Sequence, residues 1–195
     1  MAMENKNTMT QDKRANSNAE KGRGQQSKAP ARKLSEYGKQ LQEKQKVKQM
    51  YGMREKSFRR FFGIAVRQYG ATGANLLSLL EQRLDNVVYR LKMAKTRTQA
   101  RQMIVHGHIQ INNRKAHTPS IFVHEQDVIS FSPRILEKKA FLESVVDKRM
   151  SIAIKVPDWL ELDKQNRVGR VLRKPVRQDI QVPIEEHLIV ELYSK

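Results

Sequence analysis

The sequence predicts an α+β fold, in which helices form most of the structured chain and a short antiparallel β-sheet lies within it. Apolar residues recur at helical spacing from residue 37 to residue 105, they alternate with polar residues from His108 onward, and an apolar run returns near the C-terminus. With 195 residues the chain has room for one medium domain or two small ones, which excludes a large multidomain enzyme.

Residues 1–33 are predicted to form a disordered basic tail. They are rich in Asn, Lys, Gln, Ala, Gly and Ser, and they contain no aromatic and no branched aliphatic residue. A segment of this composition buries too little apolar surface to offset the entropy lost on ordering. The chain also begins without the apolar segment of a secretory signal, and it has no stretch of 18 apolar residues, so we expect a cytoplasmic protein without a membrane span.

Two amphipathic helices are expected after the tail. The first begins after Leu34 and ends at Gly52. The second covers residues 58–69, and its apolar residues, which we expect in the core, are Phe58, Phe61, Phe62, Ala65 and Tyr69. Gly70 and Gly73 are expected to bracket the loop that follows.

Two further helices are expected next. A long helix from Asn75 to Lys92 has the strongest periodic pattern in the chain. A short helix begins after Thr96 and ends near Val105, with Thr96 and Gln99 at the spacing of a capping box. Its apolar face is narrow, so we expect it to pack on the helix before it.

The short sheet is expected between residues 108 and 132. Residues 109–111 alternate apolar and polar side chains, and Asn112-Asn113 suits the positive φ angles of a tight hairpin turn before a strand resumes at Arg114. Further strands are predicted at Ile121–Val123 and Val128–Phe131.

The C-terminal third is expected to be helical and then irregular. A helix is predicted from Ile135 to Met150, and the segment after it is interrupted by Pro157, Pro175 and Pro183. The apolar run H-L-I-V-E-L-Y near the end is expected to pack back onto the helical part of the chain.

The charge of the chain indicates a polyanionic partner. It has 38 Lys and Arg against 20 Asp and Glu, a net charge of +18. The surplus is +5 in residues 1–33, +5 in 34–82, +5 in 83–132 and +3 in 133–195, so a basic tail alone does not account for it. The chain contains no cysteine, which excludes disulfides, thiolate catalysis and cysteine-ligated metal sites.

A cluster of basic side chains at residues 83–107 is the first candidate site. Acidic residues are nearly absent between Asn86 and His124, so we expect these side chains to point outward, unpaired, towards phosphates of RNA or DNA. They are Arg83, Arg90, Lys95, Arg97 and Arg101. On this basis the double substitution Arg97→Ala with Arg101→Ala should weaken RNA binding and leave the melting transition nearly unchanged.

Two strings carry a resemblance to a known family. R-L-D-N-V-V-Y-R-L at Arg83–Leu91 and T-R-T-Q-A-R-Q-M-I-V-H-G-H-I at Thr96–Ile109 closely resemble the RNA-binding module of the small-subunit ribosomal protein four family. The resemblance continues from about Lys33 to Lys195, with T-G-A-N-L-L at Thr72–Leu77 and I-E-E-H-L-I-V-E-L-Y-S-K at Ile184–Lys195.

The resemblance implies a domain organisation. Residues 34–82 would form the first part of a helical domain, residues 83–132 an inserted αL-type RNA-binding module of two helices and a short antiparallel sheet, and residues 133–195 a C-terminal part that packs back on the helical domain. Members bind a helix junction in the 5′ domain of small-subunit rRNA and nucleate assembly there. They also contact neighbouring small-subunit ribosomal protein five, lie near the path along which mRNA enters, and contribute to translational accuracy.

The implied RNA-binding residues lie in both parts. Some match the module and others the basic first helix, and Arg32 and Lys33 lie where the family approaches mRNA. The full set of candidates is Arg83, Arg90, Lys95, Arg97, Arg101, His106, His108, Arg114, Lys115, Lys44, Lys46, Lys48, Arg59, Arg60, Arg32 and Lys33. No catalytic residue, cofactor, metal or small-molecule substrate is expected.

The sequence departs from the family pattern in places and leaves alternatives open. In the family the hairpin turn is usually Asn-Gly, and the stretch that corresponds to Arg167–Gly169 is usually Met-Glu-Gly. Many members also begin with M-A-R and carry a cysteine zinc cluster; the absence of cysteine here suggests a zinc-independent form.

The residues also allow two other functions. One is a helix-turn-helix DNA-binding protein, and the other is an RNA-modifying enzyme or its accessory, with Asp85 in the R-L-D string as the candidate catalytic residue. Bacterial and organellar ribosomes both remain open, as does repression of the protein's own message.

Overall fold

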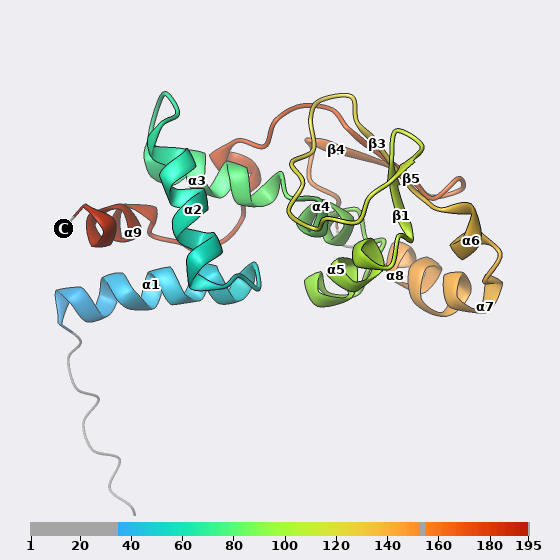
Figure 1. Cartoon of the computed structure of the whole chain (residues 1–195), viewed down its shortest axis with the longest axis horizontal. Coiled ribbons are helices and arrows are strands. Elements are labelled where there is room, and N and C mark those ends of the chain that lie inside the picture. The colour runs from blue at the N-terminus through green and yellow to red at the C-terminus, as the bar shows by residue number, and fades with distance from the viewer. Residues whose placement is uncertain (1–34, 153–154, 195) are drawn as a thin grey trace, which may run out of the picture. The chain divides into compact units, whose positions relative to one another are not determined.

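Two groups of helices and one small sheet make up the computed structural model, which describes residues 35–152 and 155–194, apart from the side chain of Val145. The first helices are α1 (Glu36–Met50), α2 (Glu55–Val66), α3 (Thr72–Glu81), α4 (Leu84–Arg90) and α5 (Arg97–Val105) (Figure 1). The strands are β1 (Ile109–Ile111), β2 (Arg114–Lys115), β3 (Val128–Phe131), β4 (Leu160–Asp163) and β5 (Val168–Val171). The remaining elements are α6 (Pro133–Leu136), α7 (Lys139–Phe141), the π-helical turn η1 (Leu142–Asp147), α8 (Lys148–Ser151), the 3₁₀ turn η2 (Arg177–Asp179) and α9 (Glu186–Tyr193).

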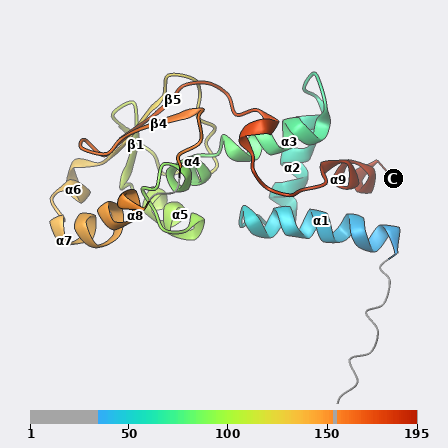
Figure 2. The same ribbon diagram turned by 180° about the vertical axis from the view of Figure 1, so that it is seen from behind.

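The first hydrophobic core joins helices from both ends of the described chain. It contains Phe58, Phe61 and Phe62 of α2 together with leucines of α3, as their helical spacing predicts. The ring of Tyr193 on α9 stacks on Phe62 with 4.5 Å between ring centroids, and α9 lies against α1 (Figure 2). The prediction that the final apolar run packs on the helical part is therefore confirmed.

The second core lies between α4, α5 and the sheet. All neighbouring strands are antiparallel, in the order β2-β1-β3-β5-β4, so the predicted α+β class is confirmed. The buried side chain of Trp159 belongs to this core, and so does Leu91. Leu91 packs against the backbone of Gly169, where any Cβ would collide with it, which explains a glycine in the middle of β5.

The hairpin between β1 and β2 has the predicted turn. Asn112 and Asn113 have φ angles of 49° and 64°, a region that asparagine tolerates better than most residues. The side-chain amide of Asn112 donates to Asp127 Oδ1 at 2.8 Å, and its oxygen accepts from the backbone N–H of Val128 at 2.9 Å. These bonds attach the turn to the start of β3.

The long helix expected from Asn75 to Lys92 is wrong, because the chain breaks between α3 and α4. The N–H of Leu84 donates to Ile121 O at 2.9 Å, and the N–H of Val123 donates to Gln82 O at 3.0 Å. Residues 121–123 were expected to form a strand, but they form only a single bridge between Phe122 and Arg83. Pairing with this distant segment replaces the helical hydrogen bonds at the break.

Two other elements differ from the expectation. The helix predicted from Ile135 to Met150 is divided into α6, α7, η1 and α8. The proline-containing segment after it supplies β4 and β5, which the sequence did not indicate.

Two residues also lie elsewhere than expected. Tyr69 is fully exposed and not in the core, because α2 ends at Val66, three residues before it. Gly73 lies inside α3, where a Cβ would meet the side chain of Glu186, and not at a loop boundary.

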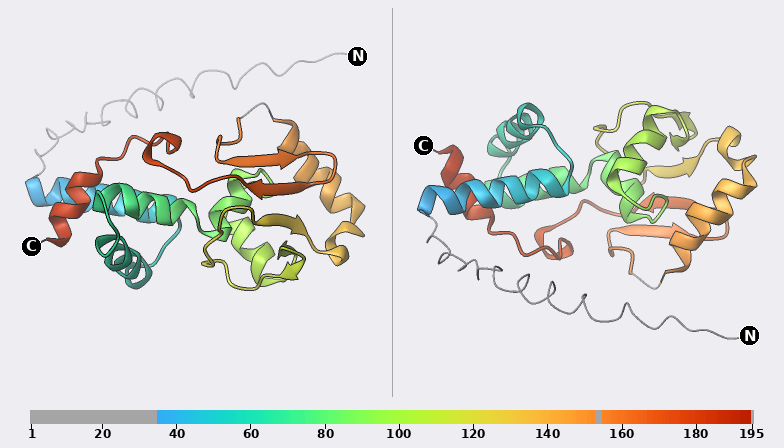
Figure 3. Two further views of the ribbon diagram at one scale, coloured as in Figure 1. Left: turned by 90° about the horizontal axis from the view of Figure 1, so that it is seen from above. Right: turned by 90° about the horizontal axis from the view of Figure 1, so that it is seen from below.

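The packing of residues 133–195 is divided between the two cores. Ile135, Leu142, Trp159 and Val171 belong to the core that α4, α5 and the sheet share, whereas Ile180, Ile184 and Ile189 belong to the core of α2 and α3. Figure 3 shows β4 and β5, in orange and red, alongside the strands of the predicted module. The expectation that this whole segment packs on the helical part thus holds only for its last residues.

Candidate nucleic-acid interface

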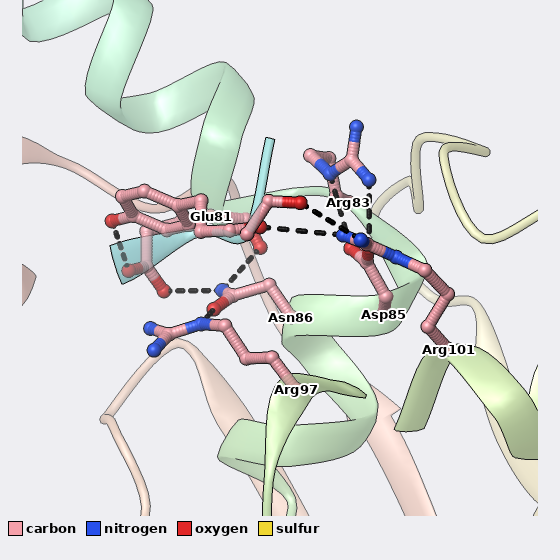
Figure 4. A network of polar contacts seen from close by, with 8 residues as sticks. Glu81, Arg83, Asp85, Asn86, Arg97 and Arg101 are labelled. Carbon is pink, nitrogen blue, oxygen red and sulfur yellow. Dashed lines mark hydrogen bonds and ion pairs between the residues drawn. The ribbon is translucent and has the colours of Figure 1, made fainter. Parts of the chain in front are cut away.

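Asp85 is a buried carboxylate that binds two arginines. Arg83 precedes the first residue of α4, and its Nε and Nη2 donate to Asp85 Oδ1 and Oδ2 at 3.0 and 2.6 Å. Arg101 on α5 donates from Nε and Nη2 to Oδ2 at 3.1 and 2.7 Å (Figure 4). The side chains of Asp85 and Arg83 are only 2% and 6% exposed, so water competes little for this ion pair.

Glu81, at the end of α3, is the second buried carboxylate. It accepts from the hydroxyl of Tyr51 at 2.7 Å, from Asn86 Nδ2 at 2.7 Å and from Arg90 Nη2 at 2.6 Å. Burial by itself would raise the pKa of Glu81, but these hydrogen bonds outweigh it and lower the pKa. Burial and the neighbouring carboxylate raise the pKa of Tyr51, which therefore stays a donor.

Arg97 lies between two aromatic rings. Its guanidinium carbon is 4.9 Å from the ring centroid of Tyr51 and 4.6 Å from that of Tyr89, and its Nε donates to Asn86 Oδ1 at 2.8 Å. Since Asn86 also donates to Glu81, Arg97 is attached to the same network (Figure 4). Burial and the nearby charge of Arg90 lower the pKa of Arg97.

The expectation that the arginines of residues 83–101 point outward and unpaired is wrong for Arg83, Arg90, Arg97 and Arg101. Arg83 and Arg101 bind Asp85, Arg90 binds Glu81, and Arg97 donates to Asn86. The two carboxylates flank the break between α3 and α4 and thus precede the segment without acidic residues. Proximity along the sequence did not reveal the pair of Arg101 with Asp85, because the two residues are sixteen positions apart and meet only when α5 packs on α4. The pair of Arg83 with Asp85, two positions apart, is a local contact that the charge pattern did not single out.

Three lysines of α1 are also paired. Lys44 and Lys48 contact the carboxylate of Glu55 at 2.9 and 3.2 Å, and Lys46 contacts Glu43 at 3.3 Å and the carbonyl of Pro183 at 2.6 Å. Hydrogen bonds from Lys44 and Lys48 lower the pKa of Glu55 to about 2. These lysines therefore link α1 to the start of α2 and to the C-terminal segment.

The remaining candidates on the described residues differ in exposure. Arg59 and Arg60 on α2, Arg114 and Lys115 on β2, and Lys95 before α5 are exposed. Thr96 caps α5 as predicted by accepting from Gln99 N at 3.1 Å, but the side chain of Gln99 returns to the N–H of Lys95, one residue earlier than in a capping box. Arg32 and Lys33, with the whole predicted tail, lie outside the described residues.

His106 and His108 line a groove of about 400 Å³ between α5 and α6–α7. Their rings meet edge to face with centroids 5.8 Å apart. Burial lowers the pKa of His108, and the charges of His106, Lys138 and Arg134 lower it further, so this site repels cations. The described residues hold no cluster of three or more metal-binding side chains, and Lys138 and Arg134 are basic groups that the sequence pattern did not single out.

A second cavity brings together basic residues from both cores. It has a volume of about 310 Å³, and its lining residues are Gly52, Met53, Arg54, Ser57, Arg83, Arg101, Pro119 and Ser120. We call it the arginine pocket. The sequence pattern singled out Arg83 and Arg101 but missed Arg54, which lies outside both motif strings, and no local signal indicated that it would meet them.

Comparisons with known proteins identify the two parts of the chain. A family model described as the ribosomal protein S4/S9 N-terminal domain matches residues 2–81, and the S4 domain model matches residues 82–129. The boundary between the two matches falls at the break between α3 and α4.

Curated relatives extend the similarity over most of the chain. The small ribosomal subunit protein uS4 of Thermoanaerobacter sp. (strain X514) is 51% identical over 164 residues, which are 84% of this chain and 77% of the relative. The uS4 proteins of Trichlorobacter lovleyi and Natranaerobius thermophilus are 50% and 47% identical, over 84% and 88% of this chain and 77% and 81% of their own lengths. The chain therefore belongs to the family of small ribosomal subunit proteins uS4.

Proposed function

We propose that this chain binds a junction of RNA helices in the 5′ domain of small-subunit rRNA and nucleates assembly there. As a member of its family, it is a structural, non-enzymatic protein of the small ribosomal subunit with an RNA-binding S4 domain. The finer assignment to one junction, and to an early step of assembly, is a proposal supported by the resemblance and by the charges on the surface.

The observation that carries the proposal is the position of the exposed basic residues. Glu81 and Asp85 neutralise arginines inside the protein, and the partly exposed Glu55 pairs with Lys44 and Lys48. The surplus charge thus remains on surfaces of both cores, and its exposed members include Arg59, Arg60, Arg114, Lys115, Arg134 and Lys138. Two basic surfaces on one scaffold can neutralise phosphates of more than one RNA helix and so lower the repulsion between helices that meet at a junction.

The other partners follow from the resemblance. We include contacts with neighbouring small-subunit ribosomal protein five and with mRNA near the path along which it enters, a contribution to translational accuracy, and a place in a cytoplasmic bacterial or an organellar ribosome. Arg32 and Lys33, the residues assigned to the mRNA contact, lie outside the described residues. No helix in the described part of the chain combines the length and apolarity needed to cross a membrane.

The alternatives from the sequence are less well supported. Catalysis by Asp85 does not fit a carboxylate that binds Arg83 and Arg101 inside the protein, and the family is not enzymatic. A helix-turn-helix DNA-binding protein would use α5 for base contacts, but Arg97 and Arg101 on this helix already bind protein groups.

The test is a competition experiment with three nucleic acids. The full chain is bound to a labelled transcript of the 5′ domain of small-subunit rRNA, and unlabelled transcript, duplex DNA or a transcript with the junction helices deleted is added. We expect only the intact transcript to compete at equimolar concentration. Equal competition by the deleted transcript contradicts the junction assignment, and preferential competition by duplex DNA favours a DNA-binding function.

A second experiment tests the early place in assembly and the zinc-independent form. The chain is added first or last to rRNA with the other small-subunit proteins, with and without a zinc chelator, and particles are separated by sedimentation. Faster particle formation on first addition is expected, with no effect of the chelator, because the sequence lacks cysteine. Loss of particles in the chelator would contradict the zinc-independent form.

A further inference from the structure

The arginine pocket is a cavity whose walls come from distant segments of the chain. Arg54 and Ser57 belong to the start of α2, which packs in the first core. Arg101 and Ser120 come from α5 and from the loop that pairs with the break between α3 and α4. Anything that binds in this cavity therefore contacts elements of both cores at once.

The pocket has an excess of positive charge. Arg54, Arg83 and Arg101 line it, and none of its eight lining residues is acidic. The carboxylate of Asp85 binds Arg83 and Arg101 from within the protein, so the four groups together carry a charge of +2. Arg83 and Arg101 share this one counterion, and Arg54 has no ion pair among the described residues.

Several hydrogen-bond donors of the pocket are unused. Arg83 donates from Nε and Nη2 to Asp85, whereas its Nη1 has no partner among the described residues, although the side chain is almost completely buried. One face of this guanidinium rests on the ring of Phe61 at 5.2 Å, which fixes its orientation. The hydroxyls of Ser57 and Ser120 likewise have no hydrogen-bond partner in the described part of the chain.

The first turn of α2 adds backbone donors. Arg54 is the residue before the helix, and its side chain does not cap it. The first intrahelical bond in this region is donated by the N–H of Phe58 to Arg54 O, so the N–H groups of residues 55–57 are left for another acceptor. A twelve-residue helix with an uncapped N-terminus, beside three arginines, favours an anion with several oxygen acceptors.

These features together select a phosphodiester. Guanidinium groups bind phosphate oxygens through paired N–H donors, and a single phosphodiester has the charge and the acceptors that this set of donors requires. We infer that the arginine pocket holds one backbone phosphate of the bound RNA, and that Asp85 is a positioning residue that keeps Arg83 and Arg101 directed into it. The inference rests on the proposed function, because the phosphate is supplied by the RNA that the protein binds.

The test compares two arginines on the same helix. Arg54→Ala removes a pocket charge, whereas Arg67→Ala removes the same charge from the other end of α2, outside the pocket. Both side chains are exposed and neither has an ion pair among the described residues, so both variants should fold like the wild-type chain. We expect Arg54→Ala to weaken binding of the 5′-domain transcript about tenfold and to reduce the salt slope by about one, and Arg67→Ala to have a clearly smaller effect.

A second readout locates the phosphate. Transcripts carrying, on average, one ethylated and hence uncharged phosphate are separated into bound and free fractions with each protein. With wild type and Arg67→Ala, we expect ethylation at one particular phosphate to weaken binding about as much as Arg54→Ala does. With Arg54→Ala, ethylation at this position should make no further difference. Ser120→Asp, which adds a negative charge from another segment of the lining, should reproduce the loss seen with Arg54→Ala.

The outcomes separate this inference from the proposed function. If the transcript binds but Arg54→Ala and Arg67→Ala behave alike, or if no ethylation effect disappears with Arg54→Ala, the pocket does not hold a phosphate and RNA binding still stands. If wild type does not bind the transcript at all, the proposed function itself fails.

Discussion

The carboxylate of Asp85 accepts two hydrogen bonds from Arg101, at 3.1 and 2.7 Å, and thereby joins the first turn of α4 to α5. Arg101 also donates to the carbonyl oxygens of Gly52 and Tyr51 at 2.8 and 3.3 Å, after the end of α1. Arg101 thus connects the first turn of α4, through the ion pair, with the segment after α1, through its two hydrogen bonds to carbonyl oxygens.

Replacing Asp85 should strongly destabilise the fold. Asp85→Asn leaves Arg83, whose side chain is only 6% exposed, without a counterion, and breaking a buried pair in this way costs about 3–5 kcal/mol. Urea unfolding of the full chain measures the loss. Asp158→Asn is the control, because its ion pair with Lys155 is exposed and should contribute less than about 1 kcal/mol. Equal stability of the two variants would contradict this role of Asp85.

Arg97→Ala should lower the stability by about 2 kcal/mol, since it removes the contacts with two rings and leaves Asn86 Oδ1 without its donor. This outcome replaces the expectation that removal of Arg97 and Arg101 leaves melting unchanged, which assumed outward side chains. Thermal unfolding of the single variants decides between the two. An unchanged melting temperature for Arg97→Ala would show that the stacked arrangement contributes nothing.

Acid should weaken the attachment of α1 to α2. The pKa of Glu55 is about 2 in the folded chain, whereas the usual value for an exposed glutamate is 4.5. Its contribution to the free energy of unfolding is therefore complete above about pH 4.5 and is lost as the pH falls towards 2. Glu55 is 41% exposed, so solvent screening limits this contribution to about 1 kcal/mol or less. Unfolding curves at pH 7, 4 and 3 should differ less for Glu55→Gln than for wild type. An identical pH dependence of the two proteins would show that Glu55 does not contribute to the acid sensitivity of the fold.

The two asparagines of the hairpin turn should respond differently to glycine. Asn113→Gly should stabilise the chain by a few tenths of a kcal/mol to about 1 kcal/mol, since glycine adopts the positive φ of 64° without strain. Asn112→Gly gains the same freedom but loses the bonds to Asp127 and Val128, so a net loss of about 1 kcal/mol is expected. Chemical denaturation measures the free energy of unfolding of both variants. Destabilisation by Asn113→Gly would contradict the argument that the positive φ of Asn113 strains the turn.

RNA binding should depend steeply on salt. If the chain neutralises about 6–10 phosphates, its affinity for the 5′-domain transcript should fall by about 10³–10⁵-fold between 50 and 200 mM salt for a duplex-like RNA. Filter binding at four salt concentrations gives the slope. A flat titration would mean that the net charge of +18 does not act through phosphate contacts.

The sequence predicted those features that depend on nearby residues. The helical spacing of Phe58, Phe61 and Phe62 predicted a buried helix face, and the pair Asn112-Asn113 predicted the hairpin, because each pattern acts within a few residues. The two resembling strings predicted the family, and the net charge predicted a polyanionic partner. Composition and local spacing are properties of the chain itself, so no folded structure was needed to recognise them.

The tertiary structure decided which basic residues have partners within the protein. Arg101 looked unpaired because it meets Asp85, sixteen positions away, only when α5 packs on α4. Arg90 looked unpaired because its partner Glu81 lies across a helix break that the periodicity did not reveal. That break exists because the loop at residues 121–123 binds the backbone there, and strands β4 and β5 exist because β3 offered an edge to pair with. Hydrogen bonds and ion pairs between distant segments depend on how the chain packs, and local sequence cannot specify them alone.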